Sequence, residues 1–111
     1  MEPRLKVWVE AEDRLVLSDY RVQLLEVIAA RGSLAEGAAA LGLSYRRAWG
    51  KVREIEANLG RKLVESSAGG PGGGSSRLTE EGERLVACYN RFRQALTEYA
   101  AQEFERQFGA S

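Results

Sequence analysis

The 111-residue sequence contains no histidine and one cysteine, Cys88. A single cysteine cannot close a disulfide within the chain, and the lack of histidine excludes Cys/His zinc sites. The same lack excludes the histidine-based nucleophiles and general bases of many enzymes. We therefore expect a protein that is not an enzyme and that needs no cofactor.

Long apolar segments are also missing. The longest apolar runs are far shorter than the roughly 20 residues that cross a bilayer as a helix. The N-terminus, MEPRLKVWVE, has no apolar core of a secretory signal. Together with the lone cysteine, these features predict a cytoplasmic protein without a membrane partner. The length of 111 residues predicts one compact domain.

Net charge is absent too, because 16 basic residues balance 16 acidic residues. Basic and acidic residues are not evenly distributed along the chain. Residues 1–43 carry five basic and seven acidic groups, residues 44–78 carry seven and three, and residues 79–111 carry four and six, giving −2, +4 and −2. A basic middle between two acidic ends favours an anionic partner for that middle segment.

Residue spacing predicts a mainly α protein with small β elements. Alternating apolar residues indicate a strand at Leu5–Glu10, which pairs with residues 15–17 as a hairpin. Ser18, Ser33, Ser44 and Thr79 have the residue types that cap helices, predicting helices at 19–30, 34–41 and 45–59 and a long one from residue 80. The apolar face of the first helix is predicted to comprise Tyr20, Leu24, Val27 and Ile28. Short strands at 62–67 and 76–79 flank the glycine-rich stretch 68–76, whose tip is expected to be disordered without a ligand.

Three helices followed by a β hairpin form a winged helix-turn-helix. We expect residues 1–79 to form this domain, with the wing at 62–79, and residues 80–111 to form a long C-terminal dimerisation helix. Ala38 is the small residue expected where two helices cross, and Gly42 is expected to make the turn before the third helix.

The third helix separates apolar from basic residues. At about 100° per residue, Ala48, Val52 and Ile55 share an inner face, whereas Arg46, Gly50 and Arg53 lie on the outer face with Arg47 and Trp49 at its flanks. Arginine suits bidentate contact with guanine, and a glycine permits close approach of a DNA backbone or base edge. The alternatives are an ordinary solvated face, an Arg53 bridge to Glu54 or Glu56, and a purely packing role for Trp49.

Two long stretches, RGSLAEGAAALGLSYRRAWGKVREIEANLGRKLVE and GGPGGGSSRLTEEGERL, resemble the N-terminal DNA-binding domain of the molybdate-responsive transcriptional regulators. More distantly, the chain resembles the LysR-type regulator domain. The resemblance implies a winged helix that binds operator DNA as a dimer. The DNA-binding positions that we predict, from the spacing and the resemblance together, are Ser33, Ser44, Tyr45, Arg46, Arg47, Gly50 and Arg53 in the helix-turn-helix and Lys62, Ser75, Ser76 and Arg77 in the wing.

Members of the molybdate-responsive family add a C-terminal molybdate-binding region, whereas this sequence ends at Ser111. We therefore expect no oxyanion sensing by these residues. The alternatives are a stand-alone regulator and one that works with a separate effector or sensor protein.

The last helix has a repeating apolar seam of about two heptads, consisting of Leu85, Tyr89, Phe92, Leu96 and Tyr99. A symmetric homodimer through this seam is the favoured interpretation, and packing of the stripe on the domain's own core is the alternative. Cys88 is expected to pack beside the seam with no basic neighbour, and a redox sensor is the alternative. A dimer of this kind predicts a palindromic double-stranded DNA operator.

The sequence thus predicts a homodimeric, sequence-specific DNA-binding transcriptional regulator. The alternative is a winged-helix module that binds another protein and not DNA. Four basic residues on the third helix favour the first interpretation.

Overall fold

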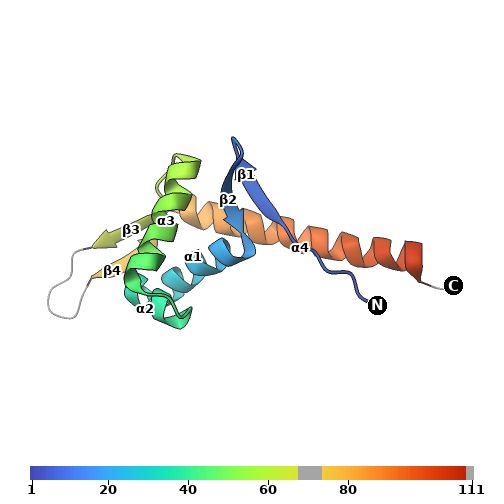
Figure 1. Ribbon diagram of the computed structural model, residues 1–111, viewed down its shortest axis with the longest axis horizontal. Helices are drawn as coiled ribbons and strands as arrows, with labels where there is room; N and C mark the ends of the chain where they lie inside the picture. The colour runs from blue at the N-terminus through green and yellow to red at the C-terminus, as the bar shows by residue number, and fades with distance from the viewer. Residues whose placement is uncertain (68–73, 110–111) are drawn as a thin grey trace.

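The computed structural model of the chain describes residues 1–67 and 74–109 (Figure 1). The elements are β1 (Trp8–Ala11), β2 (Arg14–Ser18), α1 (Asp19–Arg31), α2 (Leu34–Ala40), α3 (Tyr45–Leu59), β3 (Val64–Ser67), β4 (Ser75–Leu78) and α4 (Glu80–Phe108). The predicted order of elements and the mainly helical class with two small antiparallel sheets are confirmed. Over the described ranges, every helix is too short or too polar to cross a bilayer.

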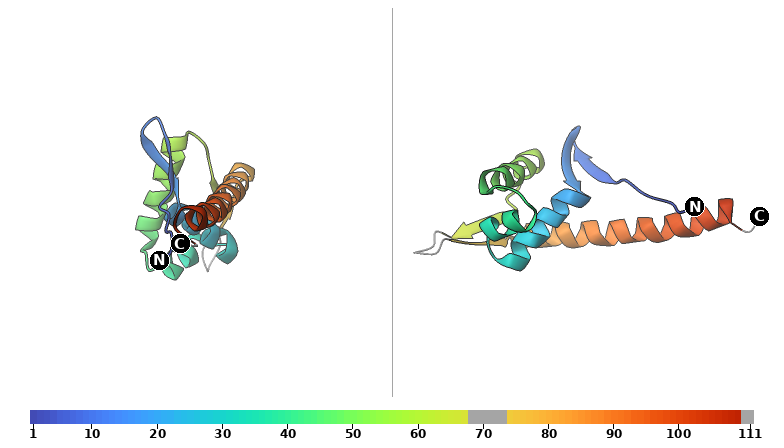
Figure 2. Two further views of the ribbon diagram at one scale, coloured as in Figure 1. Left: turned by 90° about the vertical axis from the view of Figure 1, so that its right-hand side faces the viewer. Right: turned by 60° about the horizontal axis from the view of Figure 1, so that its bottom comes forward.

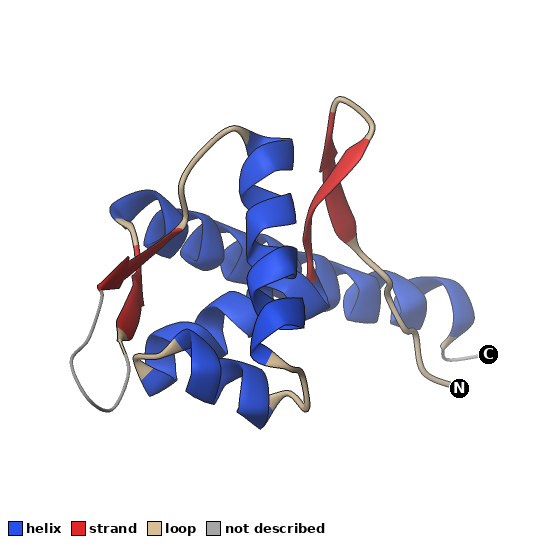
Figure 3. Cartoon of the chain, turned by 60° about the vertical axis from the view of Figure 1, so that its left-hand side comes forward, coloured by secondary structure: helices blue, strands red, loops and turns tan. Residues whose placement is uncertain are grey.

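The N-terminal hairpin starts later than predicted. β1 begins at Trp8 and not at Leu5, and it pairs with β2 in antiparallel register. The predicted alternation is confirmed within β1, since Val9 packs against the core while Trp8 is exposed, but Leu5 is exposed and does not belong to the predicted inner face. The side-chain amide of Asn58 on α3 donates to the carbonyl of Leu15 on β2 at 2.8 Å. The hairpin therefore lies beside α3, on the side away from the β3–β4 hairpin (Figure 3).

The helices begin at the residues that the capping pattern predicted. The side-chain oxygens of Ser18, Ser33, Ser44 and Thr79 each accept a backbone N–H of the following helix. Between α2 and α3, Gly42 has a φ of 70°, a left-handed conformation that favours glycine. The N–H of Leu43 then donates to the carbonyl of Ala38 at 2.8 Å. This turn fixes the direction in which α3 leaves α2.

The core forms where α1, α3, β2 and the segment that leads into β3 meet. Its largest fully buried side chains are Leu24, Leu25, Ile28, Ile55, Leu63, Val16, Val22, Val52 and Val64. The predicted inner face of α3 is confirmed, because Ala48 is fully buried together with Val52 and Ile55. Tyr20 does not belong to the buried face of α1 as predicted. It is exposed in the first turn, where its ring contacts the ammonium group of Lys51 instead of the core.

Small residues of α2 permit close packing against the other helices. Ala38, predicted where the two helices of the helix-turn-helix cross, is buried as expected. Gly37 was not predicted, and a Cβ atom on it would lie 3.0 Å from Cγ1 and 3.1 Å from Cα of Ile28, so α1 and α2 approach closely at this position. The spacing of apolar residues gave no signal for this second contact.

Strands β3 and β4 form the predicted hairpin after α3. Val64 pairs with Leu78 and Ser67 with Ser75. The glycine-rich tip that was expected to be disordered, residues 68–73, lies outside the described residues. The base of the hairpin is tied to the start of α4, because the N–H of Thr79 donates to the carbonyl of Leu63 at 2.9 Å.

Helix α4 packs against the winged helix-turn-helix by its first half only. Its buried residues, Gly82, Val86 and Tyr89, all lie in that half. The second half extends beyond the other elements, with the N-terminal segment beside it (Figures 1 and 2). The molecule is consequently elongated, at 64 × 29 × 22 Å. The division into residues 1–79 and 80–111 as separate functional units stays a prediction.

Candidate nucleic-acid interface

The outer face of α3 presents the basic side chains that the helical spacing predicted. Burial of Ala48, Val52 and Ile55 on the inner side directs the opposite side of the helix into solvent. The exposed residues there are Arg46, Arg47, Gly50 and Arg53. The arginine side chains are therefore clear of the packed interior.

These arginines are not neutralised by nearby carboxylates. The two acidic groups within reach on α3 are bound elsewhere: Glu54 pairs with Arg21 at 3.2 Å, and Glu56 accepts the backbone N–H groups of Leu63 and Val64 at 2.8 and 3.1 Å. The proposed alternative of an Arg53 bridge to either glutamate is therefore wrong. Within residues 1–67 and 74–109, none of the ion pairs involves Arg46, Arg47 or Arg53.

Arg53 instead lies over an aromatic ring. Its guanidinium carbon lies 5.4 Å from the ring centroid of Trp49, one helical turn earlier. Trp49 is half-buried and packs against the core, as the alternative interpretation of this residue expected. Lys51 makes a similar contact on the other flank, with its ammonium nitrogen 5.5 Å from the ring centroid of Tyr20.

The first turn of α3 is suited to an anion. The hydroxyl of Ser44 accepts the N–H of Arg47 at 3.1 Å, and Tyr45 is exposed beside it. The turn contains no acidic residue, so the partial positive charge of the helix N-terminus is not offset there. Ser33 has a different setting, because it is half-buried and caps α2 by accepting the N–H of Glu36 at 3.1 Å.

The wing presents three of its four predicted contact residues to solvent. Lys62, Ser75 and Arg77 are exposed, and Arg77 forms a cross-strand ion pair with Glu65 at 3.1 Å.

The prediction of Ser76 as a contact residue is wrong. Ser76 is only 7% exposed, because its hydroxyl accepts the N–H of Leu34 at 3.2 Å and lies 3.2 Å from that of Ser66. Its backbone N–H also donates to the carbonyl of Gly32 at 2.9 Å. Ser76 therefore joins the wing to the start of α2.

A hollow of about 390 Å³ lies between the end of α3 and the base of the wing. Arg53, Arg61 and Lys62 line it, together with Glu56. Arg61, which directly precedes Lys62, pairs with Glu81 on α4 at 2.6 Å. Hydrogen bonds from Arg84 and then from Arg61 hold the pKa of Glu81 below its usual value.

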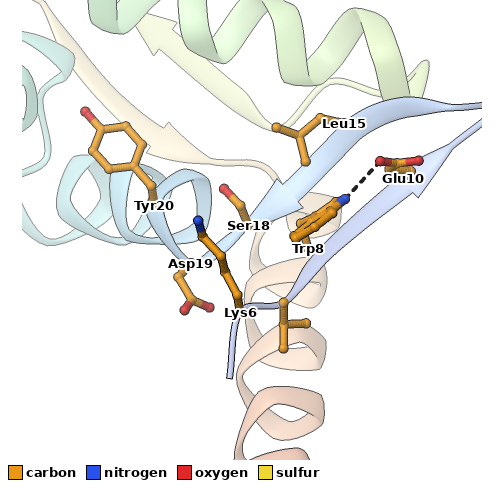
Figure 4. A pocket seen from close by; sticks show the side chains of 8 residues that line it. Lys6, Trp8, Glu10, Leu15, Ser18, Asp19 and Tyr20 are labelled. Atoms are coloured by element: carbon orange, nitrogen blue, oxygen red, sulfur yellow. Dashed lines mark hydrogen bonds between the residues drawn. The ribbon is translucent and has the colours of Figure 1, made fainter. Parts of the chain in front are cut away.

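A second hollow, of about 440 Å³, lies between the N-terminal hairpin and the start of α1 (Figure 4). Lys6, Trp8, Leu15 and Tyr20 contribute to its walls, and the indole N–H of Trp8 donates to Glu10 at 2.9 Å. It shares no lining residue with the hollow at the wing base. Acidic and basic groups both line this space, so it lacks the cationic character of the α3 face.

The predicted seam of α4 divides into two parts. Tyr89 is only 4% exposed, and its hydroxyl donates to the carboxylate of Asp19 on α1, so its assignment to a dimer seam is wrong. Leu85 is half-buried and packs against the core of its own chain. Phe92 and Tyr99 are 49% and 63% exposed, and Leu96 lies half-buried between them.

Cys88 has basic neighbours, contrary to expectation. The guanidinium groups of Arg84 and Arg91 lie 3.9 and 3.4 Å from its sulfur atom. These residues are four positions before and three after Cys88, so helical spacing alone could have found them.

The family described as "Bacterial regulatory helix-turn-helix protein, lysR family" matches residues 20–83. The chain is 34% identical over 90 residues to the DNA-binding transcriptional dual regulator ModE of Escherichia coli (strain K12), covering 81% of this chain and 34% of ModE. It is 42% identical over 77 residues to the molybdenum-pterin-binding protein MopA of Rhodobacter capsulatus, covering 69% of this chain and 29% of MopA. The chain thus spans about a third of the length of the curated relatives it matches.

Among solved structures, the fold is similar to that of CbnR_DBD in its crystal complex with DNA. The TM-score is 0.62 at 20% sequence identity, over 82% of this chain and 99% of the other. At this identity the likeness concerns the fold, which is the predicted winged helix-turn-helix. Both resemblances inferred from the sequence motifs, to molybdate-responsive and to LysR-type regulators, are confirmed by these comparisons.

Proposed function

Because this chain belongs to the lysR family of bacterial regulatory helix-turn-helix proteins, we propose that it binds double-stranded DNA sequence-specifically and regulates transcription. The observation that carries the proposal is the outer face of α3. Arg46, Arg47 and Arg53 are exposed there and form no ion pair with the described residues, on a helix whose inner face is fully buried. DNA supplies the negative charge that this surface lacks.

In the proposed complex, α3 lies in the major groove. Arg46 and Arg53 read base edges, since a guanidinium group can donate two parallel hydrogen bonds to guanine. The N–H groups that follow Ser44 contact a phosphate, with Tyr45 and Arg47 beside them. Ser33 is a further expected neighbour of the DNA backbone.

Gly50 supports this placement of α3. A glycine in the middle of a helix weakens the helix by about 1 kcal/mol relative to alanine. A Cβ atom on Gly50 would meet no other atom of the described chain within 4 Å, so internal packing does not require the glycine. Close approach of DNA between Arg46 and Arg53 provides a reason for it.

The base of the wing provides the phosphate contacts. Lys62 and Arg61 line the hollow next to α3, where a DNA phosphate would be attracted to both. Ser75 and Arg77 extend this contact along β4. Arg77 would exchange Glu65 for a phosphate, at little cost because exposed ion pairs contribute only about 0–1 kcal/mol.

We further propose that the protein acts as a homodimer, in the cytoplasm, on a palindromic operator. Phe92, Leu96 and Tyr99 lie where α4 leaves the rest of the chain, and the two aromatic residues among them are 49% and 63% exposed. A second copy packed against this part of α4 would bury them. A two-fold axis through the helices would then place two α3 helices on two half-sites.

The first experiment selects bound duplexes from a random DNA pool with the purified chain, and then measures affinity for the selected sequence by fluorescence anisotropy. We expect a two-fold symmetric motif and binding that weakens steeply as salt rises. Binding to a scrambled duplex should be weaker and should share the salt dependence. Equal affinity for the selected and scrambled duplexes would exclude sequence-specific recognition, and no binding to either would favour a protein–protein module.

A further inference from the structure

We infer that Trp49 is a positioning residue, which holds the guanidinium group of Arg53 in place for reading a base and thereby contributes to sequence preference. The inference rests on the proposed function, binding of DNA by the outer face of α3. It adds a residue that was expected either to touch DNA directly or only to fill space in the fold.

The geometry of the pair fits this role. Trp49 and Arg53 lie one turn apart on the same flank of α3, with the guanidinium carbon 5.4 Å from the ring centroid. This distance lies within the roughly 6 Å range of cation–π contacts, for which the indole ring is the best aromatic partner. A guanidinium group stacked on a ring covers one of its faces, while its N–H groups point outward in the plane. The donors needed for a bidentate contact therefore remain free.

The carboxylates that could compete for Arg53 are bound by other groups. Arg21 forms an ion pair with Glu54, and the backbone N–H groups of Leu63 and Val64 donate to the carboxylate of Glu56. An arginine beside a free carboxylate would have to give up an ion pair before it could bind a base. Among residues 1–67 and 74–109, the partner of the Arg53 side chain is a neutral ring, so this competition does not arise.

The ring of Trp49 is itself held in a fixed position. Trp49 is half-buried and packs against the core, which restricts the rotamers of its ring. A long arginine side chain loses conformational freedom when it binds, and stacking on a fixed ring reduces that loss before DNA arrives. Arg46, on the same outer face, has no aromatic contact of this kind among the described residues. The structure thus offers Arg46 as an internal control.

The experiment compares the parent with Trp49→Leu, which keeps an apolar side chain but removes the ring, and with Trp49→Phe, which restores a ring. Each protein is titrated with the selected duplex and with duplexes changed at one base pair. The base pair read by Arg53 is the one at which Arg53→Ala loses discrimination. For Trp49→Leu we expect discrimination at that base pair to fall roughly 2- to 5-fold, the size of an exposed cation–π contact. Trp49→Phe should recover part of it.

Two further readouts separate positioning from a structural role. The salt dependence of binding should be the same for Trp49→Leu and the parent, because no charge is removed. In double variants, Trp49→Leu should have a smaller effect on discrimination at that base pair when Arg53 is already alanine. Its effect should be unchanged when Arg46 is alanine. Thermal unfolding, followed by circular dichroism, confirms that each variant is folded at the temperature of the titration.

The outcomes distinguish this inference from the proposed function. If the parent shows no sequence preference, the proposed function fails and the inference falls with it. If the parent is specific but Trp49→Leu retains full discrimination, only the inference is overturned. It is also overturned if Trp49→Leu weakens binding equally at every base pair, or if Arg53→Ala does so, since Arg53 would then contact phosphate and not a base.

Discussion

Asp19 and Arg93, 74 positions apart in the sequence, join α1 to α4 through a two-pronged ion pair. Nε of Arg93 lies 3.1 Å from Oδ1 of Asp19, and Nη2 lies 3.2 Å from Oδ2. The hydroxyl of Tyr89 donates to the same carboxylate, and Arg93 also donates to the carbonyl of Leu5 at 3.0 Å. The cluster holds three segments together at the point beyond which α4 extends from the other elements.

This cluster predicts a loss of stability in acid. Hydrogen bonds from Arg93 and then from Tyr89 lower the pKa of Asp19 in the folded protein. A lowered pKa contributes stability that is present above the unfolded value, about 3.9, and is lost as pH falls through the folded value. We expect Asp19→Asn to lower the melting temperature at pH 7 and to flatten its decline below about pH 4.

A double-mutant cycle that combines Asp19→Asn with Arg93→Gln tests the cause of this acid sensitivity. Arg93→Gln should remove much of the same pH dependence, and adding Asp19→Asn to it should change little more. Melting curves of the parent and three variants between pH 2 and pH 7 provide the measurement, the range chosen to span roughly the titration of Asp. Additive effects of the two substitutions would show that the carboxylate and the guanidinium group act independently.

Tyr89 predicts a second change in alkaline solution. Burial, followed by the hydrogen bond to Asp19, raises the pKa of the Tyr89 hydroxyl to about 12. A raised pKa contributes stability that is fully present below the unfolded value, about 10, and is lost as pH rises towards the folded one. Tyr89→Phe keeps the buried ring but should lose about 1 kcal/mol of stability at pH 7.

Ultraviolet titration of tyrosinate tests this assignment. The sequence contains four tyrosines, and the step that ionises last should be missing in Tyr89→Phe. If the variant retains that step, another tyrosine has the highest pKa. The unfolding free energy of the variant should also decline less steeply than that of the parent above about pH 10.

Local sequence patterns predicted the helix starts, the turn at Gly42 and the two faces of α3, because each depends on residues within one or two turns of each other. These patterns did not predict the contacts between segments that are far apart in the sequence. Ser76 is polar and lies on a short strand, yet its hydroxyl binds the start of α2, 42 positions away. Tyr89 has the spacing of a coiled-coil seam, yet its partner is on α1. Neither partner can be inferred from spacing along one element.

Removal of either outer-face arginine should weaken specific binding. Arg46→Ala and Arg53→Ala are each expected to reduce affinity for the selected duplex by about 1–3 kcal/mol, and to relax preference at one base pair. Arg106→Ala, in the last turns of α4, removes the same charge and should have little effect on binding to a single half-site. Fluorescence anisotropy with matched and singly changed duplexes provides the measurement. Unchanged affinity of both outer-face variants, with melting temperatures like that of the parent, would contradict the site assignment.

Gly50→Ala should change stability and DNA binding in opposite directions. The new methyl group meets no atom of the described chain within 4 Å, so the helix should gain about 0.5–1 kcal/mol. The same methyl group would stand between Arg46 and Arg53 and obstruct close approach of DNA.

Gly82→Ala is the matched control for this substitution, since a Cβ atom there would lie 2.4 Å from the carbonyl oxygen of Leu63 and should destabilise the protein. Chemical denaturation and the duplex titration measure the two properties separately. If Gly50→Ala binds DNA as tightly as the parent, α3 does not approach DNA closely at this position.

The exposed aromatic residues of α4 predict a dimer that depends on a defined side of the helix. As residues of the interface, Phe92→Ala and Tyr99→Ala should each weaken self-association by more than about 1 kcal/mol, which raises the dissociation constant roughly fivefold or more. Gln94 is exposed and lies about 200° around the helix from Phe92, so Gln94→Ala should associate like the parent. Sedimentation equilibrium over a range of concentrations measures the constants.

The aromatic variants should also lose affinity for the two-fold operator while they retain affinity for a half-site, because α3 is untouched. A parent that sediments as a monomer at all concentrations, or equal effects of all three substitutions, would exclude this part of α4 as the dimer interface.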